Sequence, residues 1–265
     1  MLDVSIIIVN YNTLQITQNC IDSVIEKTKG IKYEIILVDN ASTDGSKEFF
    51  EKDNRVKHIY SEKNGGFGYG NNLGMKVAKG KYFFLLNSDT LLINNAIKEF
   101  YDYAEKDMKK RVYGCYLEHE DGGYSTSFFY FPDFSIKDFI KRIIHPNNYT
   151  PTFQVTEVEA VSGADMFFHR EIYERTKGFD ENIFLYGEEG ELQYRMLKEG
   201  YTCLLIPQPK IIHLQGKSMK ETPEKTAIRW KSHFYILKKH MWYPTYLLAR
   251  LYYSVVLRCS KMAKK

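Results

Sequence analysis

The sequence predicts an α/β fold with a mostly parallel central sheet flanked by helices, and two observations carry this prediction. Short apolar runs rich in β-branched and aromatic residues alternate with helix-like stretches through the first hundred residues, as in repeated strand–helix–strand units. Polar or glycine-containing turns follow three of these runs. Because ligands of open α/β sheets bind outside the carboxyl ends of the strands, we expect the three turns to share one crevice.

The elements follow in order along the chain. The first strands are expected over residues 5–9, 33–38, 56–60 and 82–86. The stretch 112–155 is rich in aromatic residues, with adjacent glycines and several prolines, which indicates a hairpin followed by a loop-rich segment. Regular structure then resumes with a strand, two helices and a buried strand, over residues 158–161, 170–176, 188–199 and 203–206.

The last forty residues predict a helical extension. Trp230, Phe234 and Leu237 recur at helical spacing, and a second apolar run covers residues 246–257. Polar residues recur every four positions within that run: Arg250, Ser254 and Arg258. A transmembrane helix needs about 20 largely apolar residues. An interfacial helix within 242–265 is therefore expected, with a terminal helix packed on the core as the alternative.

The net charge of +4 is unevenly distributed. Residues 217–265 carry 12 Lys and Arg against two Glu, an excess of 10 positive charges that leaves −6 over residues 1–216. A basic body that binds nucleic acid is therefore not expected. Attraction of the tail to anionic membrane lipid is the expected consequence of its charge.

Cysteine usage and the amino-terminal residues indicate a cytoplasmic protein. No Cys-x-x-Cys pair occurs, which speaks against a zinc knuckle and against a disulfide framework. The four cysteines are far apart: Cys20, Cys115, Cys203 and Cys259. The first residues lead into a strand-like run without a basic start or a small-residue cleavage site, so no signal peptide is expected. Peripheral contact with the inner face of the membrane would come from the tail.

The turns after the first two strands form a candidate binding site for a nucleotide base. Tyr11 and Asn12 follow the first strand, and Asp39 and Ser42 follow the second. A carboxylate is a suitable acceptor for a pyrimidine N–H, and Tyr11 could stack on the ring. Taken alone, Asp39 has an alternative role as the cap of a helix beginning near Thr43.

A glycine-dense loop over residues 64–74 runs into a helix. Glycines let the backbone approach a ligand closely, and a helix amino terminus favours negative charge. The loop is therefore expected to face a phosphorylated ligand, and a plain surface loop is the alternative.

These segments, with NSDT at 87–90, GADMFF at 163–168, GFDE at 178–181, YGEEGEL at 186–192 and HLQGKS at 213–218, resemble family 2 glycosyltransferases. The resemblance covers about residues 3–218. Within the family, the chain is most similar to bacterial rhamnosyltransferase-like enzymes of surface polysaccharide biosynthesis in the cell envelope. The resemblance implies a GT-A fold, with a Rossmann-like, mostly parallel central sheet and a C-terminal helical extension.

The implied activity is that of an inverting, metal-dependent glycosyltransferase. It would move a sugar from a UDP- or dTDP-linked donor to a hydroxyl of a glycan or lipid-linked saccharide. The implied organisation is a catalytic domain over 1–218 and a basic helical extension over 219–265. The domain divides into a nucleotide-binding half, 1–106, and an acceptor and catalytic half, 107–218. The sequence does not indicate an oligomeric state.

The resemblance also implies the roles of individual residues. Asp89 and His213 would bind Mn²⁺ or Mg²⁺, since hard cations take oxygen ligands and Mn²⁺ also accepts imidazole. Asn87 stands where the family's Asp-x-Asp motif has its first acid, so Asp89 would be the principal carboxylate ligand. The residues implied on the nucleotide and donor side are Tyr11, Asn12, Asp39, Ser42, Gly66, Phe67, Asn71, Asn87, Ser88 and Lys217.

The acceptor side centres on a run of acids in which glutamates replace the family's aspartates. Glu189 is the implied catalytic base, because inversion requires one carboxylate opposite the leaving diphosphate. Glu188, Glu191 and Asp165 are expected beside the acceptor. A solvated helix start is the alternative for these acids, since Glu near a helix amino terminus favours the dipole.

Two other classes of protein were weighed. The substitutions at Asn87 and in the acidic run motivate a catalytically impaired nucleotide-sugar-binding or scaffold protein. A nicotinamide-dependent oxidoreductase needs a Gly-x-Gly-x-x-Gly turn after the first strand, and the chain has NYNT at residues 10–13 instead. The oxidoreductase is therefore discounted.

Overall fold

The computed structural model describes residues 2–132, 134, 152–214 and 222–262, with side chains described up to residue 254. Its centre is one sheet with the strand order β3-β2-β1-β4-β10-β6-β11-β8. The first four of these strands are mutually parallel, and β10 joins them antiparallel to β4. Their bounds are β1 Leu2–Asn10, β2 Tyr33–Asp39, β3 Lys57–Tyr60, β4 Gly80–Asn87, β6 Val112–Cys115, β8 Thr156–Val158, β10 Asp165–His169 and β11 Cys203–Ile206. The predicted mostly parallel sheet flanked by helices is confirmed.

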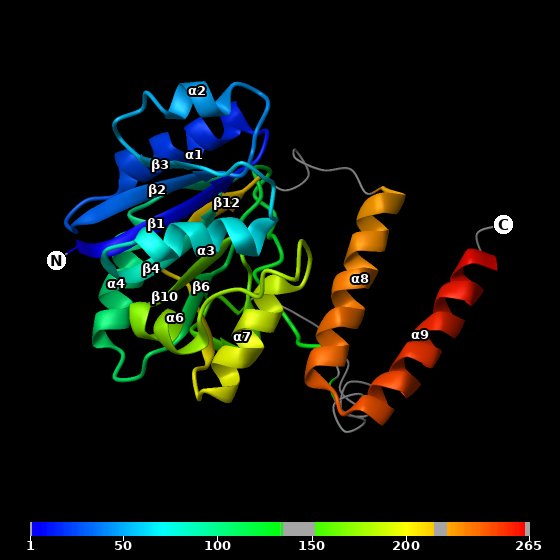
Figure 1. Cartoon of the computed structure of the whole chain (residues 1–265). Helices are drawn as coiled ribbons and strands as arrows, with labels where there is room; N and C mark the ends of the chain where they lie inside the picture. The colour runs from blue at the N-terminus through cyan, green and yellow to red at the C-terminus, as the bar shows by residue number, and fades with distance from the viewer. Residues whose placement is uncertain (1, 133, 135–151, 215–221, 263–265) are drawn as a thin grey trace.

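Helices cover both faces of the sheet (Figure 1). Alternate residues of β1 point to opposite faces, so Ile6 and Ile8 pack with α1 and α4, while Ile7 packs with α3, α6 and α7. The helices are α1 Leu14–Lys27, α2 Ser46–Phe50, α3 Phe67–Val77, α4 Ala96–Lys106, α6 Arg170–Thr176, α7 Glu188–Lys198, α8 Pro223–His240 and α9 Tyr243–Met262. This double cover buries both faces of the central strands and leaves their carboxyl ends at one edge.

Two small sheets extend that edge. β5, Thr90–Leu92, pairs antiparallel with β12, Ile211–His213, and this pairing sets His213 opposite Thr90. β7, Phe128–Phe129, pairs with β9, Ala160–Val161. The pairing of β5 with β12 joins a segment late in the chain to the turn after β4.

The structure differs from the sequence prediction in the middle of the chain. The predicted hairpin reduces to a tight turn around Gly122, because β6 pairs with β10 and β11 rather than with β7. The strand predicted over 158–161 is two strands in different sheets, and the Glu159 carboxylate between them accepts a hydrogen bond from the Phe131 amide at 2.8 Å. The central strand β10 was not predicted at all.

The carboxyl-terminal helices form an antiparallel pair beside α7 (Figure 1). One face of α8 and α9 packs with Phe131, Phe134 and Ile183, and this cluster includes Ile236, Leu237 and Tyr246 in its buried part. None of the helices in the described ranges is both long and apolar enough to cross a membrane. The division at residue 218 falls in 215–221, outside the described residues, and stays a prediction.

Candidate active site

The turns after β1 and β2 are held together by short polar side chains. The Asn12 amide donates to the Ser42 hydroxyl at 2.9 Å, and the Thr43 amide donates to the Asn12 side-chain oxygen at 2.7 Å. Asn12 has a φ of 53°, a left-handed conformation that asparagine tolerates better than most residues. Tyr11 stands beside it with 48% of its surface exposed. The two predicted base-binding turns therefore meet, with an exposed aromatic ring at their edge.

Asp39 lies beneath these turns and is fully buried. Its carboxylate accepts hydrogen bonds from the Ser42 amide at 2.7 Å and from the Asn10 side chain at 3.3 Å. The alternative of a helix cap is wrong in detail, because α2 begins only at Ser46, after Gly45. Asp39 instead stabilises the turn that carries Ser42.

The glycine-dense loop leads into α3. Gly66 has a φ of 90°, and a β-carbon there would lie 1.8 Å from the Phe184 carbonyl oxygen, so only glycine fits. The Phe67 ring packs edge-to-face on Phe179 with centroids 5.8 Å apart. Asn71 is buried, and its side chain donates to the Phe67 carbonyl at 3.1 Å rather than reaching solvent. In this structure the loop packs tightly against the segment that precedes α7.

The candidate metal ligands lie together at the carboxyl end of β4. The His213 Nε2 and Asp89 Oδ1 atoms are 3.3 Å apart, and both side chains are largely buried. The β5–β12 pairing brings them together, and the Leu214 amide donates to the Asp89 carbonyl at 2.8 Å. The other ring nitrogen of His213 is buried and has no hydrogen-bond partner among the described residues.

The rest of the NSDT turn borders this pair. The Asn87 amide donates to the Ala164 carbonyl at 3.0 Å, which ties β4 to the start of β10. The Ser88 hydroxyl lies 3.5 Å from that of Thr13, at the turn after β1. The donor-side turns and the candidate metal pair therefore share one edge of the sheet. Lys217 lies outside the described residues.

Glu189 lies close to both the glycine-dense loop and the metal turn. A β-carbon on Gly163 would lie 3.4 Å from Glu189 Cβ and 3.5 Å from the Phe67 ring. Because Gly163 directly precedes Ala164, which binds Asn87, the Glu189 side chain stands next to the end of β4. Residues from distant parts of the sequence thus lie together here.

Glu188 and Glu189 are adjacent carboxylates at the start of α7, and the pKa of each is raised. Burial and the neighbouring Glu189 charge raise the pKa of Glu188 well above its ordinary value, and one of its oxygens is buried without a partner among the described residues. Burial also raises the pKa of Glu189, although backbone amides at the helix start oppose this.

Glu191 belongs to a buried ion-pair network rather than to an open acceptor surface. Its carboxylate accepts hydrogen bonds from Arg195 at 2.9 Å, Lys239 at 2.7 Å and His240 at 3.0 Å. Burial alone would raise its pKa, but the bonds from His240 and Arg195 outweigh burial and lower the pKa to about 2. Lys239 also pairs with Asp180 at 2.6 Å. The network joins α8 to α7.

Asp165 is fully buried at the start of β10. One carboxylate oxygen accepts a hydrogen bond from the Cys115 amide at 2.6 Å, and the other is buried without a partner among the described residues. Burial raises its pKa to about 7, opposed in part by the Cys115 bond and the nearby His213. Asp165 therefore lies behind the metal pair and does not reach solvent.

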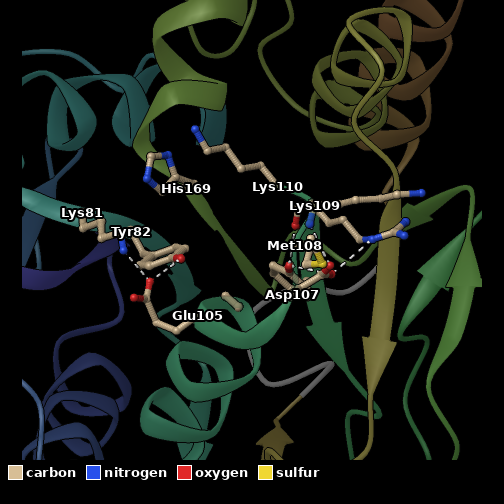
Figure 2. Close-up of a pocket in the computed structure, with 11 residues that line it drawn as sticks. Lys81, Tyr82, Glu105, Asp107, Met108, Lys109, Lys110 and His169 are labelled. Carbon is tan, nitrogen blue, oxygen red and sulfur yellow. Dashed lines mark hydrogen bonds and ion pairs between the residues drawn. The ribbon is translucent and has the colours of Figure 1, made fainter.

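A cavity of about 200 Å³ lies elsewhere (Figure 2). Its lining includes Tyr82 and His169, which face each other across β4 and β10 at the end opposite Asn87. Lys81 at its rim is paired with Glu105 at 2.6 Å. The cavity is therefore remote from the residues described above, and the candidate site is the carboxyl edge of the sheet.

Several polar residues of the site were not singled out from the sequence. Asn10 bonds Asp39, Ser42 and the threonines that follow β1, and Asn40 bonds the Gly66 carbonyl at 3.1 Å. The signal for both was an asparagine next to a strand end. Arg195 stands four residues after Glu191, a spacing that allows an ion pair on one helix face, whereas His240 carried no such signal because it is 49 residues from Glu191.

Comparisons with known proteins agree with this geometry. The model of the family "Glycosyl transferase family 2" matches residues 5–175. Glycosyltransferase GlyG of Streptococcus pneumoniae is 33% identical over 132 residues, covering 48% of this chain and 42% of the relative. The uncharacterized glycosyltransferase EpsJ of Bacillus subtilis is 25% identical, covering 85% of this chain and 65% of the relative. The matched part thus spans about two fifths to two thirds of these relatives.

A solved structure shows the same fold. The crystal structure of GalNAc-T7 with UDP, GalNAc and Mn²⁺ superposes with a TM-score of 0.61 and 19% identity, over 82% of this chain and 45% of that chain. The motifs at the carboxyl edge of the sheet and the family match over most of the chain lead to the same assignment. The chain belongs to glycosyl transferase family 2.

Proposed function

We propose that the chain transfers a sugar, with inversion, from a UDP- or dTDP-linked donor to a hydroxyl of a glycan or lipid-linked saccharide. One observation carries the proposal. Gly163 packs against the Glu189 side chain, and the next residue, Ala164, accepts a hydrogen bond from the Asn87 amide. Asn87 belongs to the turn that carries Asp89, which faces His213. The residues proposed as the base, the metal ligands and the nucleotide-binding turns all lie toward one edge of the sheet, where direct displacement needs them.

Asp89 and His213 fit a Mn²⁺ or Mg²⁺ ion. Their facing atoms, 3.3 Å apart, are an oxygen and an imidazole nitrogen, a set suited to Mn²⁺ above all. No cluster of three or more His, Cys, Asp or Glu side chains stands within the described ranges. Diphosphate oxygens and water would therefore complete the coordination. The ion, when bound, neutralises the charge of the leaving diphosphate.

Glu189 acts as the base in this proposal. Its carboxylate accepts the proton of the acceptor hydroxyl as that oxygen attacks the anomeric carbon and the diphosphate leaves from the opposite face. The raised pKa of Glu189 increases its affinity for that proton. Activity should then fall as the pH drops through the pKa of Glu189.

Tyr11, Asn12, Asp39 and Ser42 hold the base and ribose, with Tyr11 as the exposed stacking surface. Asp39 already accepts two hydrogen bonds, so it acts both by shaping the turn and as an acceptor for the ring. The donor-side set is completed by Gly66, Phe67, Asn71, Asn87, Ser88 and Lys217. Asp165, Glu188 and Glu191 support the acceptor side from within the protein.

The names of relatives favour a polymer of the poly(ribitol-phosphate) type as the acceptor. TarP of Staphylococcus aureus, a poly(ribitol-phosphate) beta-N-acetylglucosaminyltransferase, is 29% identical over 122 residues, covering 44% of this chain and 37% of the relative. The resemblance to the rhamnosyltransferase-like subgroup makes a rhamnosyl donor one candidate. It belongs in any donor panel together with glucosyl and N-acetylhexosaminyl donors.

The tail supports peripheral membrane contact through residues 242–265. Trp242, Leu248 and Leu251 of this segment are 76%, 62% and 64% exposed, whereas Tyr246 packs on the core. This apolar surface and the excess of positive charge in 217–265 together suit an anionic bilayer. Binding to phosphatidylglycerol vesicles should weaken in salt and on replacing Leu248 and Leu251 by Glu. Equal binding by that variant would reject the contact.

The test of the activity is release of nucleoside diphosphate with Mn²⁺ and a panel of UDP- and dTDP-sugars, followed by calorimetry with the bare nucleotides. Turnover of one donor, increased by a glycan acceptor, is the expected result. Binding of a nucleotide without turnover of any donor would instead support the catalytically impaired binding protein.

A further inference from the structure

The helix α8 lies against the turn that precedes α7 and its acidic start. We infer that α8 is a positioning element of the active site, which sets the location of Glu189 through the turn at residues 185–187. The inference rests on the proposed role of Glu189 as the base. It assigns Ser232, Arg229 and Ile236 a part in transfer that the family motifs, all located before residue 219, do not contain.

The turn has a backbone that needs external support. Tyr186 and Gly187 both have left-handed conformations, with φ of 72° and 90°. Glycine adopts this region freely, but for a tyrosine it is a strained conformation that persists only where the surroundings enforce it. The two residues are followed at once by Glu188, the first residue of α7. Any relaxation of the turn would therefore move the start of that helix.

One face of α8 supplies the support. The buried Ser232 hydroxyl donates a hydrogen bond to the Leu185 carbonyl at 2.7 Å. The Arg229 guanidinium lies over the Tyr186 ring, 4.6 Å from its centre. These residues are three apart and share a helix face. α8 therefore contacts the backbone and the side chain of adjacent turn residues.

The same face continues toward α7. Ile236 is buried, and its terminal carbon would lie 2.9 Å from a β-carbon at Gly187, so the helix approaches the turn as closely as glycine allows. One turn further on, His240 bonds the buried Glu191 carboxylate at 3.0 Å. Glu189 thus lies midway between two points, Gly187 and Glu191, that α8 contacts.

The opposite side of the segment rests on the donor loop. The Phe184 carbonyl would meet a β-carbon of Gly66 at 1.8 Å, and the Asn72 side chain of α3 bonds Glu181 at 2.9 Å. The segment before α7 is therefore enclosed between the glycine-dense loop and α8. Without α8, only one of these two supports would remain.

Glu189 needs such support more than a shorter acid would. Its side chain has one more methylene, and hence one more rotatable bond, than the aspartate of the family motif. A displacement of about 1 Å can cost on the order of 100-fold in rate. Substitutions that release the turn should therefore lower kcat and leave the base-binding turns after β1 and β2 unchanged.

Two variants test the inference. Arg229→Leu changes an exposed side chain and should preserve the fold, and Ser232→Ala removes the hydroxyl that binds Leu185. Their matched controls are Lys231→Leu, an exposed cation on the same helix, and Ser254→Ala, an exposed hydroxyl on α9 that bonds only its own helix. Each is assayed with the donor that wild type turns over best, beside Glu189→Gln, and each is probed by hydrogen exchange of residues 183–190.

The expected result is a 5- to 50-fold lower kcat for Arg229→Leu and Ser232→Ala, with the donor KM within about twofold of wild type. Exchange should be faster over residues 183–190 and unchanged in β1 and β2, and the controls should match wild type. Wild-type kcat and exchange in both variants, an effect confined to donor KM, or an equal loss in the controls would overturn the inference. Full activity of Glu189→Gln would instead overturn the proposed base, whatever the exchange data show.

Discussion

The two halves of the site are held together by different chemistry. On the donor side, the turns after β1 and β2 are joined by amides and hydroxyls, with Asn10, Asn12 and Ser42 at the centre. On the acceptor side, α7 is held by buried charges, chiefly Glu191 with its cationic partners. Neither the donor-side amides and hydroxyls nor Glu191, whose pKa is lowered to about 2, titrates near neutral pH, whereas the buried Asp165 on the acceptor side has a pKa raised to about 7. Sensitivity to pH should therefore reside in the acceptor half.

The largest change in stability is expected for a substitution in the acceptor-side network. Glu191→Gln leaves Arg195, Lys239 and His240 with one buried anion fewer. Removing one member of a buried ion pair costs about 3–5 kcal/mol, so urea unfolding should show a loss near the lower figure. The control Glu174→Gln, on an exposed position of α6, should change stability by less than about 0.5 kcal/mol.

The same network gives a defined pH response. The folded-state pKa of Glu191 is lowered to about 2. Its contribution to stability is therefore complete above the unfolded pKa and is lost only as the pH falls toward 2. Between pH 5 and 8 the stability difference between Glu191→Gln and wild type should stay constant. A difference that changed steeply in that range would contradict the ion-pair description.

Asp165 should behave in the opposite sense. Its pKa rises from 3.8 to about 7 on folding, so its favourable contribution is complete below pH 4 and is lost as the pH rises through 7. At about 1.4 kcal/mol per pKa unit, roughly 4–5 kcal/mol separates the limits. The melting temperature of wild type should fall between pH 5 and 8, and Asp165→Asn should flatten that slope. An unchanged slope would show that Asp165 does not titrate there.

The fold was largely predictable from the sequence, and the site only in part. Strands 33–38 and 203–206 and helix 170–176 are found within a residue of the observed bounds, because local apolar patterns determine them. The pairing of His213 with Asp89 was implied by motif order and not by any local pattern. β10 was missed because its apolar run is short and sits directly before a helix.

The bonds from α8 to Glu191 and the contacts of α8 with the turn before α7 could not be predicted from the sequence. The bonds of Glu191 to Lys239 and His240 span 48 and 49 residues, and that of Ser232 to Leu185 spans 47. No spacing rule connects such positions, since a loop of any geometry could separate them. The resemblance implied a donor-side role for Asn71, and its side chain donates to the Phe67 carbonyl one turn earlier in α3.

At the border between the two halves, Asp89→Asn should weaken catalysis strongly. It removes the carboxylate that faces His213, and loss of one charge-stabilising group typically costs about 100-fold or more in rate. Turnover should fall by at least that factor, and half-saturation by Mn²⁺ should shift upward. Asp102→Asn, at a surface pair with Lys98, serves as the control. Metal-independent turnover in wild type would contradict the metal role.

The smallest effect is expected on the donor side. Ser42→Ala removes the acceptor for the Asn12 amide and the Asn10 side chain, which should cost about 1 kcal/mol of stability. Affinity for UDP or dTDP, measured by calorimetry, should fall only a few-fold, with kcat at saturating donor unchanged. A loss confined to kcat would place Ser42 in the acceptor half and break the division between the halves.

The most direct test of the central claim is the rate of Glu189→Gln, a nearly isosteric change that removes only the ability to accept a proton. With Mn²⁺ and the best donor of the panel, transfer and hydrolysis should both be lost, while calorimetry shows nucleotide binding equal to that of wild type. Transfer at the wild-type rate would contradict the account, because the base would then lie elsewhere.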